Sequence, residues 1–265
     1  MNIDPISARL HRRARPCGPL MLMYHAVTPE GGRPRWAWAV SMRQFQAQLD
    51  FLAAEGYATL TQRELAATPP AALPARAVVS TFDDGYRNNL LASAELARRG
   101  MRASWFIVTG NIGGAPGWPS EHRPEGRMLD AAELRRLHAD GMEVGSHSVS
   151  HPRLPTTSDD QLRRELADSR AALEDILGAP VDSFAYPYGA WDARCAAAVA
   201  QAGYTSACTT RTGWALRDND PFRLRRLTVF NSDTTSTLAR KLAVAGHNVA
   251  WRDIARLTLS KLVRP

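Results

Sequence analysis

Two short stretches carry residues whose types and spacing could do chemistry. In "STFDDGY", Asp83 and Asp84 directly follow a β-branched run, and in "GSHSVSHPRL", His147 and His151 are separated by three residues. Adjacent carboxylates repel each other and are costly to bury, so something must compensate their charge. Two nearby histidines and a carboxylate form a common three-ligand set for a catalytic divalent metal, with one position left for water.

Each stretch alone also has an ordinary structural explanation. Asp-Asp-Gly is typical of a turn in which an aspartate caps a helix. His-x-x-x-His is found in loops where both rings bond to backbone groups. The occurrence of both stretches at the ends of predicted strands favours the metal site over these two explanations.

The elements that must position these residues alternate between strand and helix. Strands are predicted at 20–27, 57–60, 77–82, 103–108, 142–148, 183–189, 204–208 and 222–229, and helices at 41–56, 61–67, 88–100, 130–141, 159–178 and 192–203. This alternation favours a parallel sheet with helical crossovers. About seven units in 265 residues indicate a single-domain α/β fold, a distorted (β/α) barrel similar to a TIM barrel. Asp83, His147 and Tyr188 each fall at a strand end, so they can converge on one rim.

Three motifs resemble a known family. "STFDDGY", "GSHSVSHPRL" and "FAYPYGAW", in this order, are similar to the first three motifs of the polysaccharide deacetylases, the NodB-type domains of carbohydrate esterase family 4. "MLMYHAVTP" and the segment from "WAVSMRQF" to "LTQREL" resemble the leading part of the branch that contains YPYG. The resemblance covers about residues 20–230. It implies hydrolysis of the N-acetyl amide of an N-acetylhexosamine in a glycan or glycan precursor, with release of acetate.

The resemblance also implies a role for each motif residue. Asp83 matches the general base, and Asp84, His147 and His151 match the metal ligands. Tyr188 matches the tyrosine whose backbone N–H helps to stabilise the oxyanion. A ligand set of two histidines and one aspartate suits zinc, with cobalt, nickel and manganese as alternatives.

The sequence departs from the family pattern at two points. Ala185 stands where the third motif often carries the arginine that orients the catalytic aspartate, and "FRLRRLTVF" lacks the histidine that usually acts as general acid. We expect Arg225 or Arg226 to replace the arginine, although both could lie on a solvated strand face. We expect His25 to enter the pocket and act as the acid or bind substrate, the alternative being a structural histidine.

Specificity should come from the loops at 110–127 and 211–222, because loops vary most on such a scaffold. Trp191 could form an apolar wall for the acetyl group or a sugar ring, or simply pack in the core. Two further functions stay open. One is a non-catalytic glycan-binding protein on a decayed deacetylase barrel, and the other is a deformylase or deacetylase of lipid-linked sugars.

Composition limits the partners, the cellular location and the cysteine chemistry that we expect. The net charge is +7, but no basic run is interleaved with aromatic residues, so no nucleic acid partner is expected. No signal peptide or run of about 18 apolar residues is visible, which favours a cytoplasmic enzyme. Three cysteines without a CxxC make a disulfide framework or a cysteine zinc site unexpected. The oligomeric state is left open.

We divide the chain into three parts. Residues 1–19 form an N-terminal extension, residues 20–232 the catalytic domain, and residues 233–265 basic amphipathic helices packed on the barrel. The alternative for the last part is peripheral contact with a membrane surface, which would suit a lipid-linked substrate.

Overall fold

Eight parallel strands form the centre of the computed structural model, which describes residues 3–29, 32–118 and 120–254. Seven of them follow the order β10-β1-β5-β6-β7-β8-β9, and β4 pairs with the first half of β5. Cys208, at the end of β9, forms a parallel bridge with Leu224, just before β10, so the sheet curls round on itself. The predicted distorted (β/α) barrel is confirmed. The strands are β1 Leu20–Tyr24, β4 Ala58–Leu60, β5 Ala77–Phe82, β6 Ala103–Ile107, β7 Glu143–Ser146, β8 Ser183–Ala185, β9 Ser206–Cys208 and β10 Leu227–Thr228.

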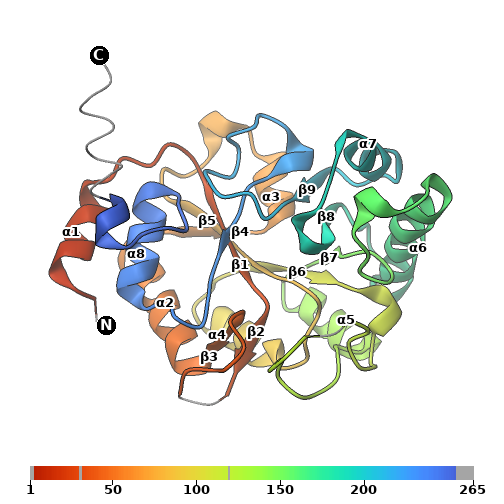
Figure 1. Ribbon diagram of the computed structural model, residues 1–265, viewed down its shortest axis with the longest axis horizontal. Helices are drawn as coiled ribbons and strands as arrows, with labels where there is room; N and C mark the ends of the chain where they lie inside the picture. Colours follow the sequence, from red (N-terminus) through yellow and green to blue (C-terminus); the bar gives the residue numbers. More distant parts are fainter. Residues whose placement is uncertain (1–2, 30–31, 119, 255–265) are drawn as a thin grey trace.

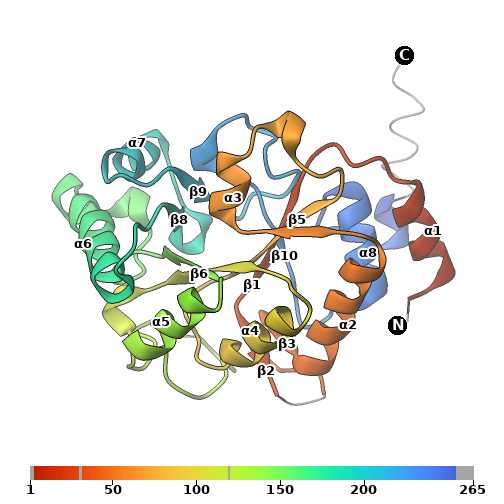
Figure 2. The same ribbon diagram turned by 180° about the vertical axis from the view of Figure 1, so that it is seen from behind.

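Helices surround the sheet on its outer side (Figures 1 and 2). Side chains of Ser41, Thr61, Asp130, Ser158 and Asp192 cap helix starts by accepting a backbone N–H three residues on, as short polar residues do. Thr61 and Glu64 form a reciprocal capping box. The helices are α1 Pro5–Arg13, α2 Met42–Ala54, α3 Gln62–Ala67, α4 Asn89–Arg98, α5 Ala131–Ala139, α6 Asp159–Leu177, α7 Ala193–Gln201 and α8 Thr235–Val244. Short 3-10 turns lie at Pro70–Ala72, Thr109–Asn111, Leu154–Thr156, Pro187–Gly189 and Pro221–Arg223.

The interior of the barrel holds a small apolar cluster, and helix α3 covers one end of the barrel. Alternate strand residues face inward, and Met21, Val79, Phe106 and Leu224 pack there into a small buried cluster with Leu65 of α3. α3 covers the first residues of several strands. Its Gln62 N–H donates to the Ser104 hydroxyl, and its side-chain amide donates to the Ser206 hydroxyl. The predicted site residues Asp83, Asp84 and His147 lie at the other end, directly after β5 and β7.

The first predicted strand is interrupted at His25. β1 ends at Tyr24, and Ala26–Thr28 (β2) pairs instead with Ala39–Ser41 (β3) in a separate two-stranded sheet. The amide of Asn89 holds this break, since its oxygen accepts the Val27 N–H and its nitrogen donates to the His25 carbonyl. His25 thus lies at the finishing end of β1.

Helices α1 and α8 pack together on the flank of the barrel. α1 and α8 contact each other, and α8 also packs on α2 (Figure 1). The apolar residues Leu238, Ala239 and Leu242 of α8 are buried there. This face of α8 is therefore covered by protein. Residues 255–265 of the predicted C-terminal helices lie outside the described residues. No helix in the described part of the chain has the length and apolar character to cross a membrane.

Candidate active site

Asp84, His147 and His151 converge where β5 and β7 end. Nε2 of His147 lies 3.6 Å, and Nε2 of His151 3.5 Å, from Oδ1 of Asp84. The three ligand atoms lie within 4.8 Å of one another, and all three residues are buried. Ligand atoms about 2.1 Å from a tetrahedral metal lie roughly 3.4 Å apart. The spacing therefore fits one small divalent cation.

Two hydrogen-bonding details support that fit. Nδ1 of His147 lies 2.7 Å from the Ala185 carbonyl oxygen, which can only accept, so the proton sits on Nδ1 and Nε2 is left with its lone pair. Oδ1 of Asp84 is buried and has no hydrogen-bond partner among the described residues. A buried carboxylate oxygen without a partner is costly, and a cation at this point would satisfy it.

The backbone around the site is strained. Seven non-glycine residues in the described part of the chain have positive φ, and four of them lie here, namely Asp84 (75°), Ser148 (69°), His151 (60°) and Tyr188 (59°). The left-handed region costs a non-glycine residue free energy, and such residues gather at functional sites. The turns after β5, β7 and β8 are thus held in unusual shapes that present the site residues.

Asp83 is paired with Arg226 inside the barrel. Nη1 of Arg226 donates to Oδ1 of Asp83 at 2.6 Å and Nη2 donates to Oδ2 at 2.8 Å, which is a bidentate pair. Both side chains are buried. Arg226 also donates from Nε to the Thr209 carbonyl and from Nη1 to the Thr81 hydroxyl. The expected replacement for the arginine missing at Ala185 is therefore Arg226.

Arg225 does not take that place. Its guanidinium pairs with Asp218 at 2.7 and 2.8 Å, on the opposite face of the chain from Arg226. Leu224 belongs to the buried cluster inside the barrel, so strand alternation turns Arg226 inward and Arg225 outward.

The two aspartates have opposite pKa shifts. Burial disfavours the charge of Asp83, but Arg226 and then His147 outweigh it and lower its pKa to about 2. Burial and the neighbouring Asp83 raise the pKa of Asp84 to about 8. Without a cation Asp84 would hold a proton at neutral pH, whereas a bound divalent ion reverses that preference. One carboxylate is stabilised by an arginine and the other is suited to a metal.

These residues face an open pocket of about 440 Å³. His25 lines it, beside the rings of Trp36 and Trp38 at centroid distances of 5.8 and 6.3 Å. Burial is the main cause that lowers the pKa of His25 to about 4, with Asp83 opposing. Nδ1 of His25 has no hydrogen-bond partner in the described part of the chain. The ring is therefore neutral at pH 7, and its Nδ1 is not held by another protein group.

Aromatic walls surround the pocket, and most of them were not predicted. Trp118 stacks on His151 at 4.4 Å, and the Tyr188 ring lies 4.5 Å from His151 and under the guanidinium of Arg153. Trp36 joins this wall by donating its indole N–H to Ser120. Within this wall, the loop 110–127 and Tyr188 were indicated by the sequence. Trp36 and Trp38, in "RWAWAV", follow no periodic pattern.

The structure decides between the two alternatives for Trp191 and differs from one expectation about the pocket. Trp191 does not line the pocket, because its ring packs near Tyr186 and beneath the guanidinium of Arg223. Residues 211–222 do not line it either. Ala215 of that segment instead joins the buried cluster inside the barrel and donates its N–H to Pro19.

A parallel (β/α) barrel with a buried Asp-His-His cluster at the finishing ends of its strands defines the class as a barrel hydrolase with a candidate metal site. The family model described as "Polysaccharide deacetylase" matches residues 71–207. YxkH of Bacillus subtilis (strain 168), which carries the name of a polysaccharide deacetylase, is 30% identical over 212 residues, 79% of this chain and 70% of that protein. The chain belongs to the polysaccharide deacetylase family.

Solved structures agree with this assignment. The Streptococcus pyogenes deacetylase PplD in complex with acetate has a TM-score of 0.74 and 25% identity, covering 86% of this chain and 99% of that one. IcaB from Ammonifex degensii has a TM-score of 0.71 and 25% identity, covering 86% and 97%. The protein is therefore an enzyme of the sugar N-deacetylase class, as its sequence motifs indicated.

Proposed function

We propose that the enzyme removes the N-acetyl group from an N-acetylhexosamine unit of a glycan, with a divalent metal bound by Asp84, His147 and His151. The observation that carries the proposal is the division between the two aspartates. Oδ1 of Asp84 lies beside two histidine Nε2 atoms, while Arg226 holds Asp83 ionised in the same pocket. Zinc suits this ligand set best. A divalent metal at such a site lowers the pKa of water and polarises the acetyl carbonyl.

The chain's own residues account for the proton transfers. Asp83 takes the proton of the attacking water, which it can do because Arg226 keeps it charged. The protonated carboxyl then gives that proton to the amine nitrogen as the C–N bond breaks. The backbone N–H of Tyr188 donates to the tetrahedral oxyanion.

We propose that His25 hydrogen-bonds the departing amine while that transfer occurs. Its pKa of about 4 means that the ring must first gain a proton if it is to act as the acid itself. The rings of Trp36, Trp38 and Trp118 are apolar faces of the kind that pack on sugar rings, which supports a glycan substrate.

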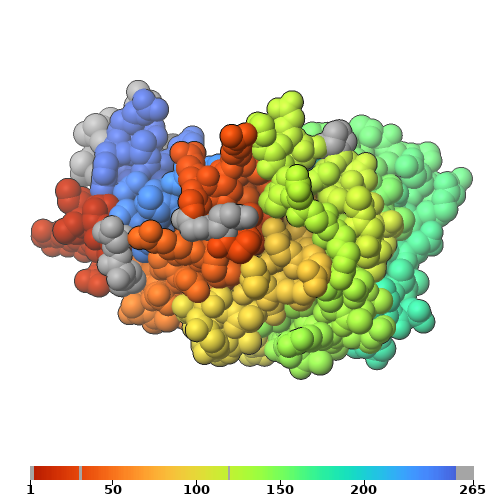
Figure 3. Space-filling view, turned by 90° about the horizontal axis from the view of Figure 1, so that it is seen from below, coloured from red at the N-terminus to blue at the C-terminus, as the bar shows by residue number. Residues whose placement is uncertain are grey.

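A second hollow beside the pocket supports a substrate longer than one sugar. It has a volume of about 1100 Å³, shares Trp36 with the pocket, and is lined also by Arg35, Tyr86, Arg87 and Arg127. Figure 3 views the molecule from this side, with the segment 32–38 in orange-red beside the yellow-green loop that carries Trp118. An oligosaccharide with its N-acetyl group at Asp84 could extend past Trp36 into this groove.

The test combines metal analysis with acetate release. We expect about one divalent ion per chain and release of acetate from N-acetylglucosamine oligosaccharides. Asp83→Asn should keep the metal and lose acetate release, and Asp84→Asn should lose both. Sugar binding that survives chelation, with no acetate from any substrate, would instead favour the glycan-binding alternative. Formate release, or acetate only from lipid-linked sugars, would reassign the substrate to the other alternative.

A further inference from the structure

The strand that directly follows Arg226 lacks a strand neighbour on one side. β10 pairs with β1 through Leu22–Leu227 and Met23–Thr228, and the Val229 N–H donates to the Met23 carbonyl. In a strand, successive residues direct their backbone groups to opposite sides. The N–H and C=O of Thr228 therefore point away from β1, toward a side where the segment after β9 reaches only as far as Arg226, whose N–H donates to the Arg211 carbonyl.

Two side chains from beyond the barrel fill that side. The Thr228 N–H donates to Nε2 of His247 at 2.6 Å, and Nζ of Lys241 donates to the Thr228 carbonyl at 2.8 Å. Lys241 also pairs with Asp233, and both of these side chains are buried. One side chain thus accepts from Thr228 and the other donates to it, as a neighbouring strand would.

We infer that Lys241 and His247 are positioning residues, which replace the missing strand neighbour of β10 and thereby hold Arg226 in line with Asp83. The inference rests on the proposed function, in which Asp83 is the base. A buried backbone group without a partner is costly, so without these contacts β10 would shift or admit water. Arg226 precedes β10 directly, and the two bonds of its guanidinium fork to Asp83 require exact alignment.

The tautomer of His247 is fixed by this arrangement. A backbone N–H can only donate, so Nε2 carries no proton and Nδ1 donates to the Thr212 hydroxyl at 2.8 Å. Burial and then Lys241 lower the pKa of His247 to about 4, with Asp233 opposing, so the ring stays neutral. The ring therefore links β10 to the segment after β9.

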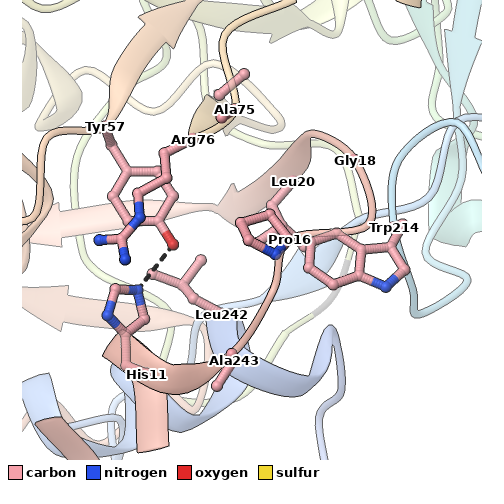
Figure 4. A pocket seen from close by; sticks show the side chains of 12 residues that line it. His11, Pro16, Gly18, Leu20, Tyr57, Ala75, Arg76, Trp214, Leu242 and Ala243 are labelled. Atoms are coloured by element: carbon pink, nitrogen blue, oxygen red, sulfur yellow. Dashed lines mark hydrogen bonds between the residues drawn. The ribbon is translucent and has the colours of Figure 1, made fainter. Parts of the chain in front are cut away.

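The experiment compares His247→Leu, which removes the acceptor, with His247→Gln, whose side-chain oxygen can still accept the Thr228 N–H. A matched control is His11→Leu. His11 is buried, bonds to the Tyr57 hydroxyl at 2.9 Å, and lies among Arg76, Leu20 and Leu242 away from the central pocket (Figure 4). The readouts are kcat, KM, metal per chain, and hydrogen exchange at the Thr228 amide and the Arg226 guanidinium.

We expect His247→Leu to lower kcat about tenfold or more, since small misplacements of catalytic groups have effects of this size. KM and metal per chain should change little, because the ligands lie on β5 and β7 turns. Exchange at Thr228 and Arg226 should accelerate. His247→Gln should recover most of kcat and of the exchange protection, and His11→Leu should lower thermal stability without lowering kcat.

A kcat for His247→Leu within twofold of the wild type would overturn the inference. So would a loss of kcat that only follows lost metal or that His11→Leu reproduces. The exchange measurements separate the inference from the proposed function. If the wild type releases no acetate, the proposed function fails, while unchanged exchange at Arg226 in His247→Leu refutes the positioning role on its own.

Discussion

Arg226, the residue directly before β10, donates to both carboxylate oxygens of Asp83, at 2.6 and 2.8 Å. The carboxylate and the guanidinium are both removed from water. Charges buried in this way are tolerated only as a pair, and removal of one partner leaves the other uncompensated. The relationship therefore links the stability of the barrel interior to the ionisation of the proposed base.

Substitution of Arg226 should reduce both stability and activity. Arg226→Met leaves a buried carboxylate without its partner, which costs about 3–5 kcal/mol in comparable pairs. Arg226→Lys keeps a charge but loses the bidentate geometry, and we expect a milder loss of stability with kcat lower by about tenfold or more. Denaturant unfolding and acetate release would measure the two effects.

A second-site variant makes this prediction more specific. Ala185 occupies the position at which the family motif often has an arginine, and it lies inside the barrel. In Arg226→Met, the added change Ala185→Arg should restore part of both stability and kcat. Equal activity of Arg226→Met and the wild type would show that Asp83 needs no arginine.

The sequence did not distinguish Arg225 from Arg226 as the partner of Asp83. Strand alternation allowed either residue to face inward, and the register of "FRLRRLTV" is set by contacts that are distant in sequence. Leu224 meets β9, and Leu227 meets Leu22 of β1. The order of strands and helices was predictable because it follows local periodicity. Which residues of this segment face the barrel interior could not be predicted from local periodicity.

The pocket walls were less predictable than the metal cluster. Asp84, His147 and His151 belong to motifs that keep close spacing within one turn after a strand. Trp36 and Trp38 come from the segment between β2 and β3, where the chain follows neither helical nor strand period. Their place beside His25 depends on the break after Tyr24, and Asn89 of α4 stabilises that break. Sequence alone does not place such contacts.

Removal of the metal should destabilise the protein. A ligand that binds only the folded state stabilises it by about 2.7 kcal/mol at a hundredfold excess over its Kd. We expect zinc added to the chelated protein to raise Tm. Asp84→Asn should abolish that rise, because Oδ1 of Asp84 is the atom shared by both histidine contacts. Calorimetry with and without zinc tests this, and a Tm rise of the same size in Asp84→Asn would place the metal elsewhere.

Acid should destabilise the packing of α1. Burial and then Arg76 lower the pKa of His11, with Glu55 opposing. As the pH falls below about 6.5, His11 is protonated in the unfolded chain while it is still neutral in the folded state. The contribution of His11 to the free energy of unfolding is therefore full above that pH and is lost as the pH falls below it. One such group contributes at most about 1.4 kcal/mol per pH unit.

The variant His11→Gln isolates this contribution. Its free energy of unfolding should fall less steeply than that of the wild type between about pH 6.5 and pH 5. Chemical denaturation at several pH values measures both slopes. An identical slope in the two proteins would mean that His11 is not held neutral by its surroundings.

Gly189 should be needed for the turn that presents Tyr188. Its φ is 65°, and a Cβ there would lie 2.1 Å from the Thr210 hydroxyl oxygen, closer than any normal contact. Gly189→Ala must therefore shift the turn that contains the Tyr188 N–H, and we expect kcat to fall by about tenfold or more with metal content unchanged. Tyr188→Phe should keep kcat, because the proposed role uses the backbone.

The matched control is Gly56→Ala, where φ is 71° but a Cβ would meet nothing within 4 Å. Both alanines carry the same kind of backbone strain, so a loss of kcat confined to Gly189→Ala isolates the clash with Thr210 as its cause. Equal kcat in the two variants would remove the turn at Tyr188 from the mechanism.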